Sequence, residues 1–286
     1  MKYAVFTAST PDWTPEEAVA QLAAQGWNGI EWRITDQEQA QPPGFWTGNR
    51  ATIPLTGLED ELPRVAGITR EAGLALSGLG AYVPAADHAN VERVLAAAAT
   101  LGAGRVRVTM PQLGNGDYRE LMDATRRDMA WIADRAAYHG VTALVELHHR
   151  TIVASASAAM RLLDGLAPEH VGVIHDIGNL TIEGFEDPLA AFEMLGPYLA
   201  HVHVKNVAWL VTGTRADGGP RWSAEWAPLR EGQADIEAYF AALRRFGYGG
   251  WVTVEDFSTV VPLAERTRDN LAYLRELDQR VRIREA

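Results

Sequence analysis

The sequence of 286 residues contains no cysteine. Disulfides, thiolate zinc sites and cysteine nucleophiles are therefore excluded together, and any bound metal must be held by histidine, aspartate or glutamate. Long apolar runs are also missing, since no stretch reaches the roughly 18 apolar residues of a membrane span. The segment MKYAVFTAST lacks the basic start and apolar stretch of a signal peptide. We expect a cytoplasmic protein with no membrane partner.

Positive charge is scarce, with 26 lysine and arginine residues against 37 aspartate and glutamate residues. The formal net charge of -11 repels phosphate backbones, so we expect no nucleic-acid partner. The fractions of hydrophobic residues (47%) and charged residues (22%) are those of an ordinary globular protein. A chain of this length forms either two modest domains or one large α/β barrel.

Short apolar runs alternate with helical patterns along the whole chain, with no linker or low-complexity break. Strands are predicted at KYAVFTAS from Lys2, GIEWRI from Gly29, LALSGLGAY from Leu74, RVRVTMP from Arg105, TALVELHH from Thr142, VGVIHDIGN from Val171, LAHVHVKN from Leu199 and WVTVEDFS from Trp251. Helices are predicted from Pro15 after the N-cap Thr14, within Leu58 to Glu71, at VERVLAAAATLG, around Tyr118 to Tyr138, after Ser155 or Ser157, at PLAAFEMLG, at IEAYFAALRRFGY, and roughly from Leu263 to Val281.

Eight strand and helix pairs predict an α/β fold, a single (β/α)₈ TIM barrel over residues 1-286, with its active site at the C-terminal ends of the strands. A doubly wound sheet is the competing architecture. It is disfavoured because no glycine-rich phosphate turn follows the first strand.

Metal-competent side chains lie at the ends of the last four predicted strands: Glu146, Asp176, His203 and Glu255. Three acids buried together cannot all ionise without a cation, so a divalent metal resolves the electrostatic problem. One histidine with three carboxylates is a mainly oxygen site, which favours Mn²⁺ or Mg²⁺, with Zn²⁺, Co²⁺ and Fe²⁺ as alternatives. The competing interpretation is a set of hydrogen-bonded core groups.

The strand LAHVHVKN places three polar side chains on one face at three depths, because alternate strand residues point the same way. Only the layer level with the other acids can share their metal, and this selects His203. We expect His201, one layer deeper, to be a core or supporting residue. Lys205, one layer higher, is predicted to contact the substrate, with a solvated rim lysine as the alternative.

The motifs ELHH, HDIGN, HVHVKN and PLREGQADIEAYFAALRRFGYGGWVTVE resemble, in their order and strand-end placement, the xylose isomerase-like TIM-barrel superfamily. This is the sugar phosphate isomerase/epimerase group, which includes D-tagatose 3-epimerase, inosose dehydratase and endonuclease IV. The resemblance spans all eight units. It implies that Glu146, Asp176, His203 and Glu255 bind one divalent metal, for which the donor set makes Mn²⁺ the first candidate. It also implies that Glu146 and Glu255 move protons on opposite faces of the substrate.

The sequence departs from this family in places that concern the substrate. Many relatives have a histidine three residues after the aspartate, contacting the substrate or a second metal, where this chain has Asn179. The lysine of HVHVKN is usually followed by aspartate and here by Asn206. The usual Gly-Glu-Gly is here Arg230-Glu231-Gly232.

Further candidates for contacting the substrate are His148, Asn179, Arg33 and Trp46. His148 shares a face with Glu146, and its alternative role is to orient that glutamate. Arg33 ends the second strand, and a structural network with Glu31 is its alternative role.

The remaining histidines and two long loops are also assigned. His149 and His175 have the opposite parity, which favours the helix layer or the rim. The loop from Thr35 to Leu58 carries Phe45 and Trp46, and the loop from Val207 to Gly232 carries three tryptophans, Trp209, Trp222 and Trp226. Loops this long are usually functional, and aromatic rings pack against sugars. Packing over the barrel top or a dimer contact is the alternative.

The predicted function is a metal-dependent isomerase or epimerase acting on a keto sugar or polyol through an enediolate. The first alternative is a dehydratase or lyase acting on a keto-inositol or 3-keto-glycoside. A nuclease resembling endonuclease IV ranks lower, because such enzymes use a three-metal cluster with several more histidines, including the one replaced here by Asn179, and because this chain is acidic. A structural or sensory metal-binding barrel is the fourth interpretation. We expect a small-molecule carbohydrate, unphosphorylated, as the partner, and a homo-oligomer remains open.

Overall fold

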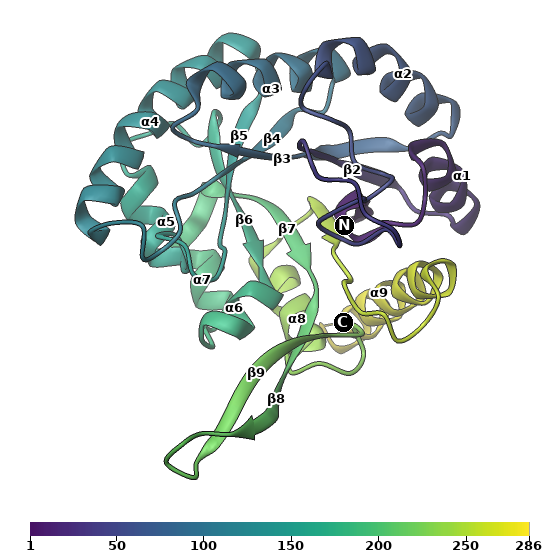
Figure 1. Cartoon of the computed structure of the whole chain (residues 1–286), viewed down its shortest axis with the longest axis vertical. Coiled ribbons are helices and arrows are strands. Elements are labelled where there is room, and N and C mark those ends of the chain that lie inside the picture. The colour runs from purple at the N-terminus through teal and green to yellow at the C-terminus, as the bar shows by residue number, and fades with distance from the viewer. Residues whose placement is uncertain (286) are drawn as a thin grey trace.

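Eight parallel strands close into a barrel surrounded by helices (Figure 1). The structure is a computed structural model, and it describes residues 1–285. The barrel strands are β1 (Lys2–Phe6), β2 (Gly29–Ile34), β3 (Ala75–Pro84), β4 (Arg105–Thr109), β5 (Thr142–Glu146), β6 (Val171–Asp176), β7 (Leu199–Val204) and β10 (Trp251–Val254). They follow the order β1-β10-β7-β6-β5-β4-β3-β2 around the barrel, which confirms the predicted TIM barrel.

The predicted helices also form. They are α1 (Pro15–Gln25), α2 (Leu58–Glu71), α3 (His88–Leu101), α4 (Tyr118–His139), α5 (Ala156–Leu163), α7 (Pro188–Leu195), α8 (Ile236–Phe246) and α9 (Leu263–Glu285). Two short 3-10 turns, η1 (Thr7–Ser9) and η2 (Gly196–Tyr198), flank strands. Among the described residues, no helix has both the length and the apolar character needed to cross a membrane.

Helix caps explain where several of these helices begin. At α1 the Thr14 side chain accepts a hydrogen bond from the Glu17 backbone, and the Glu17 side chain accepts one from the Thr14 backbone. This reciprocal capping box satisfies two backbone donors that the helix leaves free. Of the two serines proposed as the cap of α5, Ser155 is the N-cap.

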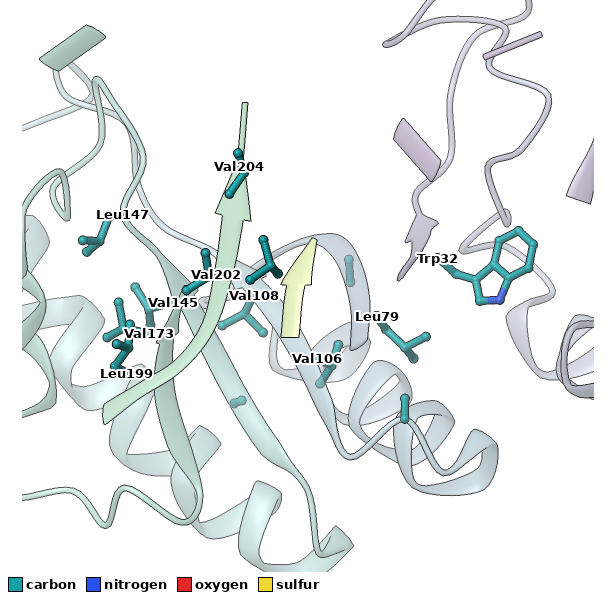
Figure 2. Packing of buried hydrophobic residues seen from close by; sticks show 14 of the residues in the cluster. Trp32, Leu79, Val106, Val108, Val145, Leu147, Val173, Leu199, Val202 and Val204 are labelled. Atoms are coloured by element: carbon teal, nitrogen blue, oxygen red, sulfur yellow. The ribbon is translucent and has the colours of Figure 1, made fainter. Parts of the chain in front are cut away.

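The hydrophobic core lies mainly between the barrel and the helix layer. Val202 and Val204 of β7 belong to this core, together with Val173 of β6 (Figure 2). Val202 and Val204 alternate along β7 with His201 and His203, so the two histidine side chains point to the opposite face, into the barrel interior. The same alternation that builds the core thus directs the histidines into the barrel.

Two segments differ from the prediction. The predicted strand VGVIHDIGN ends at Asp176, and its last three residues instead begin a short helix, α6 (Ile177–Glu183). The segment from Val207 to Gly232 was predicted as a loop, but most of it forms an antiparallel hairpin of β8 (Asn206–Thr214) and β9 (Pro220–Ala227). The turn contains Asp217-Gly218, with Gly218 at φ 85°. Aspartate followed by glycine is typical of hairpin turns, so this part of the sequence could have been predicted as a hairpin.

Candidate metal centre and active site

Four strands that are neighbours around the barrel bring the predicted metal ligands together. Glu146 ends β5, Asp176 ends β6, His203 lies in β7 and Glu255 directly follows β10. One ligand atom from each lies within 4.8 Å of the others, and all four side chains are buried. Parallel strands of similar length end at one level of the barrel, so these side chains converge although they are far apart in sequence.

His203 faces all three carboxylates with one ring nitrogen. Its Nδ1 atom lies 3.2 Å from Glu255 Oε1, 3.5 Å from Glu146 Oε1 and 4.0 Å from Asp176 Oδ2. This nitrogen is buried without a hydrogen-bond partner. Buried polar atoms are rarely left unpaired. An unpaired ring nitrogen that faces three carboxylates is a donor that a divalent cation would use.

The other ring nitrogen of His203 is held by Glu31 from β2. Glu31 Oε2 lies 3.2 Å from His203 Nε2 and 2.9 Å from His201 Nε2. Burial opposes ionisation of Glu31, but the two histidines hold its pKa well below the usual range. A metal-binding histidine characteristically donates its other ring N–H to such a carboxylate. His201 also meets Thr253 Oγ1 at 3.0 Å, so it lies deeper, as predicted.

Lys205 lies directly against the acidic cluster. Its Nζ atom is 2.6 Å from Glu255 Oε2, 2.7 Å from Asp176 Oδ2 and 3.9 Å from Glu146 Oε1. Burial alone would lower the pKa of Lys205, but the three carboxylates raise it well above the usual range. With only 3% of its surface exposed, Lys205 is not the solvated rim residue considered as the alternative.

The carboxylates differ in how their charge is balanced. Burial raises the pKa of Asp176 to about 7, although Lys205 acts in the opposite direction. Burial also opposes ionisation of Glu255, yet Lys205 and His203 lower its pKa to about 2. Burial again opposes ionisation of Glu146, but its neighbouring cations hold its pKa well below the usual range. The two glutamates are therefore ionised near neutral pH.

Arg107 in β4 is a site residue that the sequence analysis missed. Its Nη1 atom donates to Glu146 Oε2 at 2.5 Å, and its guanidinium carbon lies 4.4 Å from the centre of the Tyr82 ring. Burial would lower the pKa of Arg107, but Glu146 and other neighbours raise it above the usual range. A signal was present, because Arg107 alternates with Val106 and Val108 in RVRVT and so points into the barrel.

An open cavity connects this cluster to the barrel mouth. Five of the predicted residues line it, namely Glu146, Glu255, His148, Lys205 and Trp46. His148 is half-buried, and its Nδ1 atom donates to the backbone oxygen of His149 at 2.8 Å. A bound molecule in this cavity would therefore meet carboxylates, an ammonium, an imidazole and an indole together.

Asn179 and Arg33 lie behind the cavity wall rather than among its lining residues. Asn179 is buried in α6, where its side-chain amide donates to Glu146 Oε1 at 3.2 Å. Its carbonyl oxygen accepts from His149 Nδ1 at 2.9 Å, and its backbone N–H donates to Asp176 Oδ1 at 2.9 Å. Asn179 thus orients two predicted metal ligands.

Arg33 holds the loop that carries Trp46. Its guanidinium donates to Gln37 Oε1 at 3.0 Å, to Thr52 Oγ1 at 2.8 Å and to the Trp46 backbone oxygen at 3.3 Å. The network with Glu31 considered above does not form, because Glu31 bonds to the two histidines of β7 instead.

His175 and His149 lie outside the cluster, as their parity indicated. His175 is buried between β6 and the helices, where its Nδ1 atom meets the Tyr239 hydroxyl at 2.8 Å. Burial lowers its pKa to about 3, so this imidazole is neutral. His149 is half-buried and contacts Asn179, as described above.

Comparison with known proteins supports the barrel fold and the family resemblance. The family model described as xylose isomerase-like TIM barrel matches residues 19–277. Inosose dehydratase of Lacticaseibacillus casei is 27% identical over 129 residues, which cover 43% of this chain and 43% of that protein. The chain therefore matches less than half the length of this curated relative.

Two solved structures show the same fold. The 3-keto-D-glucoside 4-epimerase from E. coli has a TM-score of 0.71 and 19% identity, over 96% of this chain and 99% of that one. The IolI protein, solved with a zinc atom, has a TM-score of 0.74 and 16% identity, over 98% of this chain and 99% of that one.

Proposed function

Because the chain belongs to the xylose isomerase-like TIM-barrel family, we propose that it is a divalent-metal-dependent isomerase or epimerase. Its substrate would be a keto sugar or polyol, converted through an enediolate. The observation that supports this most directly is the pair of buried, ionised glutamates that converge from β5 and β10 on one cavity. Two carboxylates that reach one substrate are what proton removal and return require.

The proposed metal ligands are Glu146, Asp176, His203 and Glu255. The unpaired His203 Nδ1 atom and its position facing the three carboxylates support this set, because a cation would satisfy them together. A donor set of three carboxylates and one imidazole favours Mn²⁺, with Mg²⁺, Co²⁺ and Zn²⁺ as alternatives. When bound, the ion would polarise a substrate carbonyl and so acidify the neighbouring C–H.

The proposed acid/base pair has a symmetric arrangement of partners. Glu146 Oε2 accepts a hydrogen bond from Arg107, and Glu255 Oε2 accepts one from Lys205. Each glutamate therefore keeps Oε1 turned toward His203 and the centre of the cluster. Since both carboxylates are ionised, either can accept a proton. Return of a proton to the opposite face requires its partner to be protonated beforehand, through the open cavity.

The cavity wall supports the binding of a small carbohydrate. Lys205 would stabilise the negative oxygen of an enediolate, and His148 would contact a hydroxyl group. The Trp46 ring, 4.7 Å from that of Phe257, offers an apolar face to a sugar ring. Asn179 and Arg33 would act through Glu146 and through the Trp46 loop respectively.

A dehydratase or lyase is the second candidate, in which the enediolate expels a β-substituent. The aromatic group near the mouth supports it, since Trp46 and Trp226 both lie against Phe257 at 4.7 and 5.3 Å. Such a group would accommodate a leaving group larger than a hydroxyl. The acidic residues and the proposed metal would have the same roles in both reactions.

Incubation of the metal-loaded protein with ketohexoses and 3-keto-glycosides in D₂O separates the two reactions. We expect deuterium at the carbon beside the carbonyl and an epimeric product, detected by NMR and mass spectrometry. Glu146→Gln and Glu255→Gln should each abolish this exchange while metal analysis verifies loading. Formation of a dehydrated product or release of an aglycone without an epimer would instead identify a lyase, and neither exchange nor elimination with any substrate would refute both reactions.

A further inference from the structure

One face of the β8–β9 hairpin carries a row of apolar side chains. Directly opposed residues of an antiparallel pair point to the same face of the sheet. Three such pairs, two residues apart along each strand, share this face: Val207 with Trp226, Trp209 with Ala224, and Val211 with Trp222. The opposite face is mixed, since it carries Ala208 with Glu225 and Leu210 with Ser223.

The body of the protein covers only the inner part of this apolar face. The Trp226 ring lies 5.3 Å from Phe257, at the barrel mouth. The Trp209 indole donates to the backbone oxygen of Thr181 in α6 at 3.2 Å. The outer pair is uncovered, because Val211 and Trp222 are 56% and 55% exposed. The hairpin extends away from the barrel at this end (Figure 1).

A hairpin of this kind is not stable by itself in water. Two-stranded sheets are marginal, and a third strand or a packed hydrophobic face is normally needed. Within residues 1–285, β8 and β9 pair only with each other, so both outer edges of the hairpin also lack a partner strand. The outer half therefore has the composition and geometry of a contact surface.

An apolar hollow lies beside the base of the same hairpin. It is bordered by Leu180 and Thr181 of α6, by Phe185 and by Pro188 of α7. Phe185 is 82% exposed. The hollow and the hairpin adjoin, since α6 packs against β8. One side of the molecule thus carries both a protruding apolar element and an apolar recess.

We propose that this side is the contact between two copies of the chain, related by a two-fold axis. A two-fold axis brings the same patch of both copies together, so each hairpin tip would reach the other copy's hollow. The charge distribution supports a second copy. Two acidic chains of net charge -11 repel each other in general, so a contact between two copies requires a surface that carries no net charge. The hairpin is such a surface, because it carries two cationic and two anionic residues, Arg215, Arg221, Asp217 and Glu225.

Single lysine substitutions on the two faces test this contact in the full-length protein. We expect the unaltered chain to sediment as a dimer in analytical ultracentrifugation. Val211→Lys should raise the dimer dissociation constant by about 30-fold or more, as for loss of an interface hot spot. Phe185→Lys should act in the same way. Leu210→Lys is the matched control, because Leu210 is the adjacent residue, is 49% exposed and points to the other face.

Two outcomes would overturn the proposal. One is a chain that stays monomeric at every concentration, and the other is equal dissociation by Leu210→Lys and Val211→Lys. Circular dichroism and thermal melting verify that the variants are folded.

A spin label attached at Arg221→Cys gives a second readout, and the label is at a single position because the chain has no cysteine. We expect label-to-label dipolar coupling that Val211→Lys removes, and the absence of coupling in the otherwise unaltered chain would contradict the contact.

Discussion

His203 has a different partner on each ring nitrogen, and this division determines what it can bind. The Nε2 side is taken by Glu31, while Nδ1 faces three carboxylates without a hydrogen bond. A histidine held in this way presents one lone pair in a defined direction, which is how proteins orient metal ligands. His201 is two residues away on the same strand and also meets Glu31, but its contacts lie deeper in the barrel.

The pair of histidines therefore gives a matched test of the metal site. His203→Ala should abolish binding of Mn²⁺, measured by isothermal titration calorimetry, because it removes the only nitrogen of the proposed ligand set. His201→Ala should retain binding with at most about a 10- to 100-fold loss, since it affects the site through Glu31. If His201→Ala abolishes binding and His203→Ala does not, the assignment of layers along β7 is incorrect.

The sequence predicted some of these residues and not others, for a physical reason. Strand parity and the position of strand ends identified the acidic cluster and the order of His201, His203 and Lys205 in depth. The contact between Glu31 and His203 joins residues 172 positions apart, so only the closed barrel reveals it. Arg107 could have been found, because an arginine between valines on an interior strand face requires a partner.

At the scale of elements, α6 supports the site more closely than its length suggests. Asp176 caps this helix by accepting from the Asn179 backbone, so one carboxylate both starts a helix and joins the cluster. Gly178 in its first turn packs against Lys205. A β-carbon at this position would lie 2.2 Å from Lys205 Cγ and 3.0 Å from its backbone oxygen. The glycine of HDIGN is thus explained by the close approach of α6 to Lys205, which directly follows β7.

Alanine substitution of two glycines tests this role of α6. Gly178→Ala should destabilise the protein by about 1–3 kcal/mol in urea unfolding, because overpacking forces Lys205 away from its carboxylates. Gly67→Ala is the control, since Gly67 lies within α2 and has nothing within 4 Å of its added β-carbon. It should stabilise the protein by about 0.5–1 kcal/mol. Equal effects of the two changes would show that Gly178 is not packed as described.

The two segments that sequence reasoning missed lie beside the site. The α6 segment is only seven residues long, so it shows little helical periodicity, and its N-cap coincides with a predicted metal ligand. The hairpin contained an Asp-Gly turn signal, but its strands alternate less clearly than the barrel strands because their outer ends are exposed. The barrel itself was predictable, since eight repeats of one pattern reinforce each other.

At the scale of the whole molecule, folding, metal binding and pH are linked through the cluster that joins four strands. In the metal-free protein, neighbouring carboxylates raise the pKa of His203 well above its usual value despite burial, and burial raises that of Asp176 to about 7. A raised pKa in the folded state stabilises the protonated form. This contribution is complete at low pH and is lost as pH rises through the folded values. A bound metal requires the deprotonated forms instead.

Metal should therefore stabilise the protein more as pH rises. We expect the increase in Tm on adding Mn²⁺, measured by calorimetry against a sample with chelator, to grow from about pH 6 to about pH 8. A ligand at roughly 1,000 times its dissociation constant adds about 4 kcal/mol to the free energy of unfolding. Asp176→Asn should reduce this gain and weaken its pH dependence, because one of the competing protons is removed with the ligand. A metal-induced increase in Tm that stays constant across this range would contradict the link, since proton and metal would then not share these side chains.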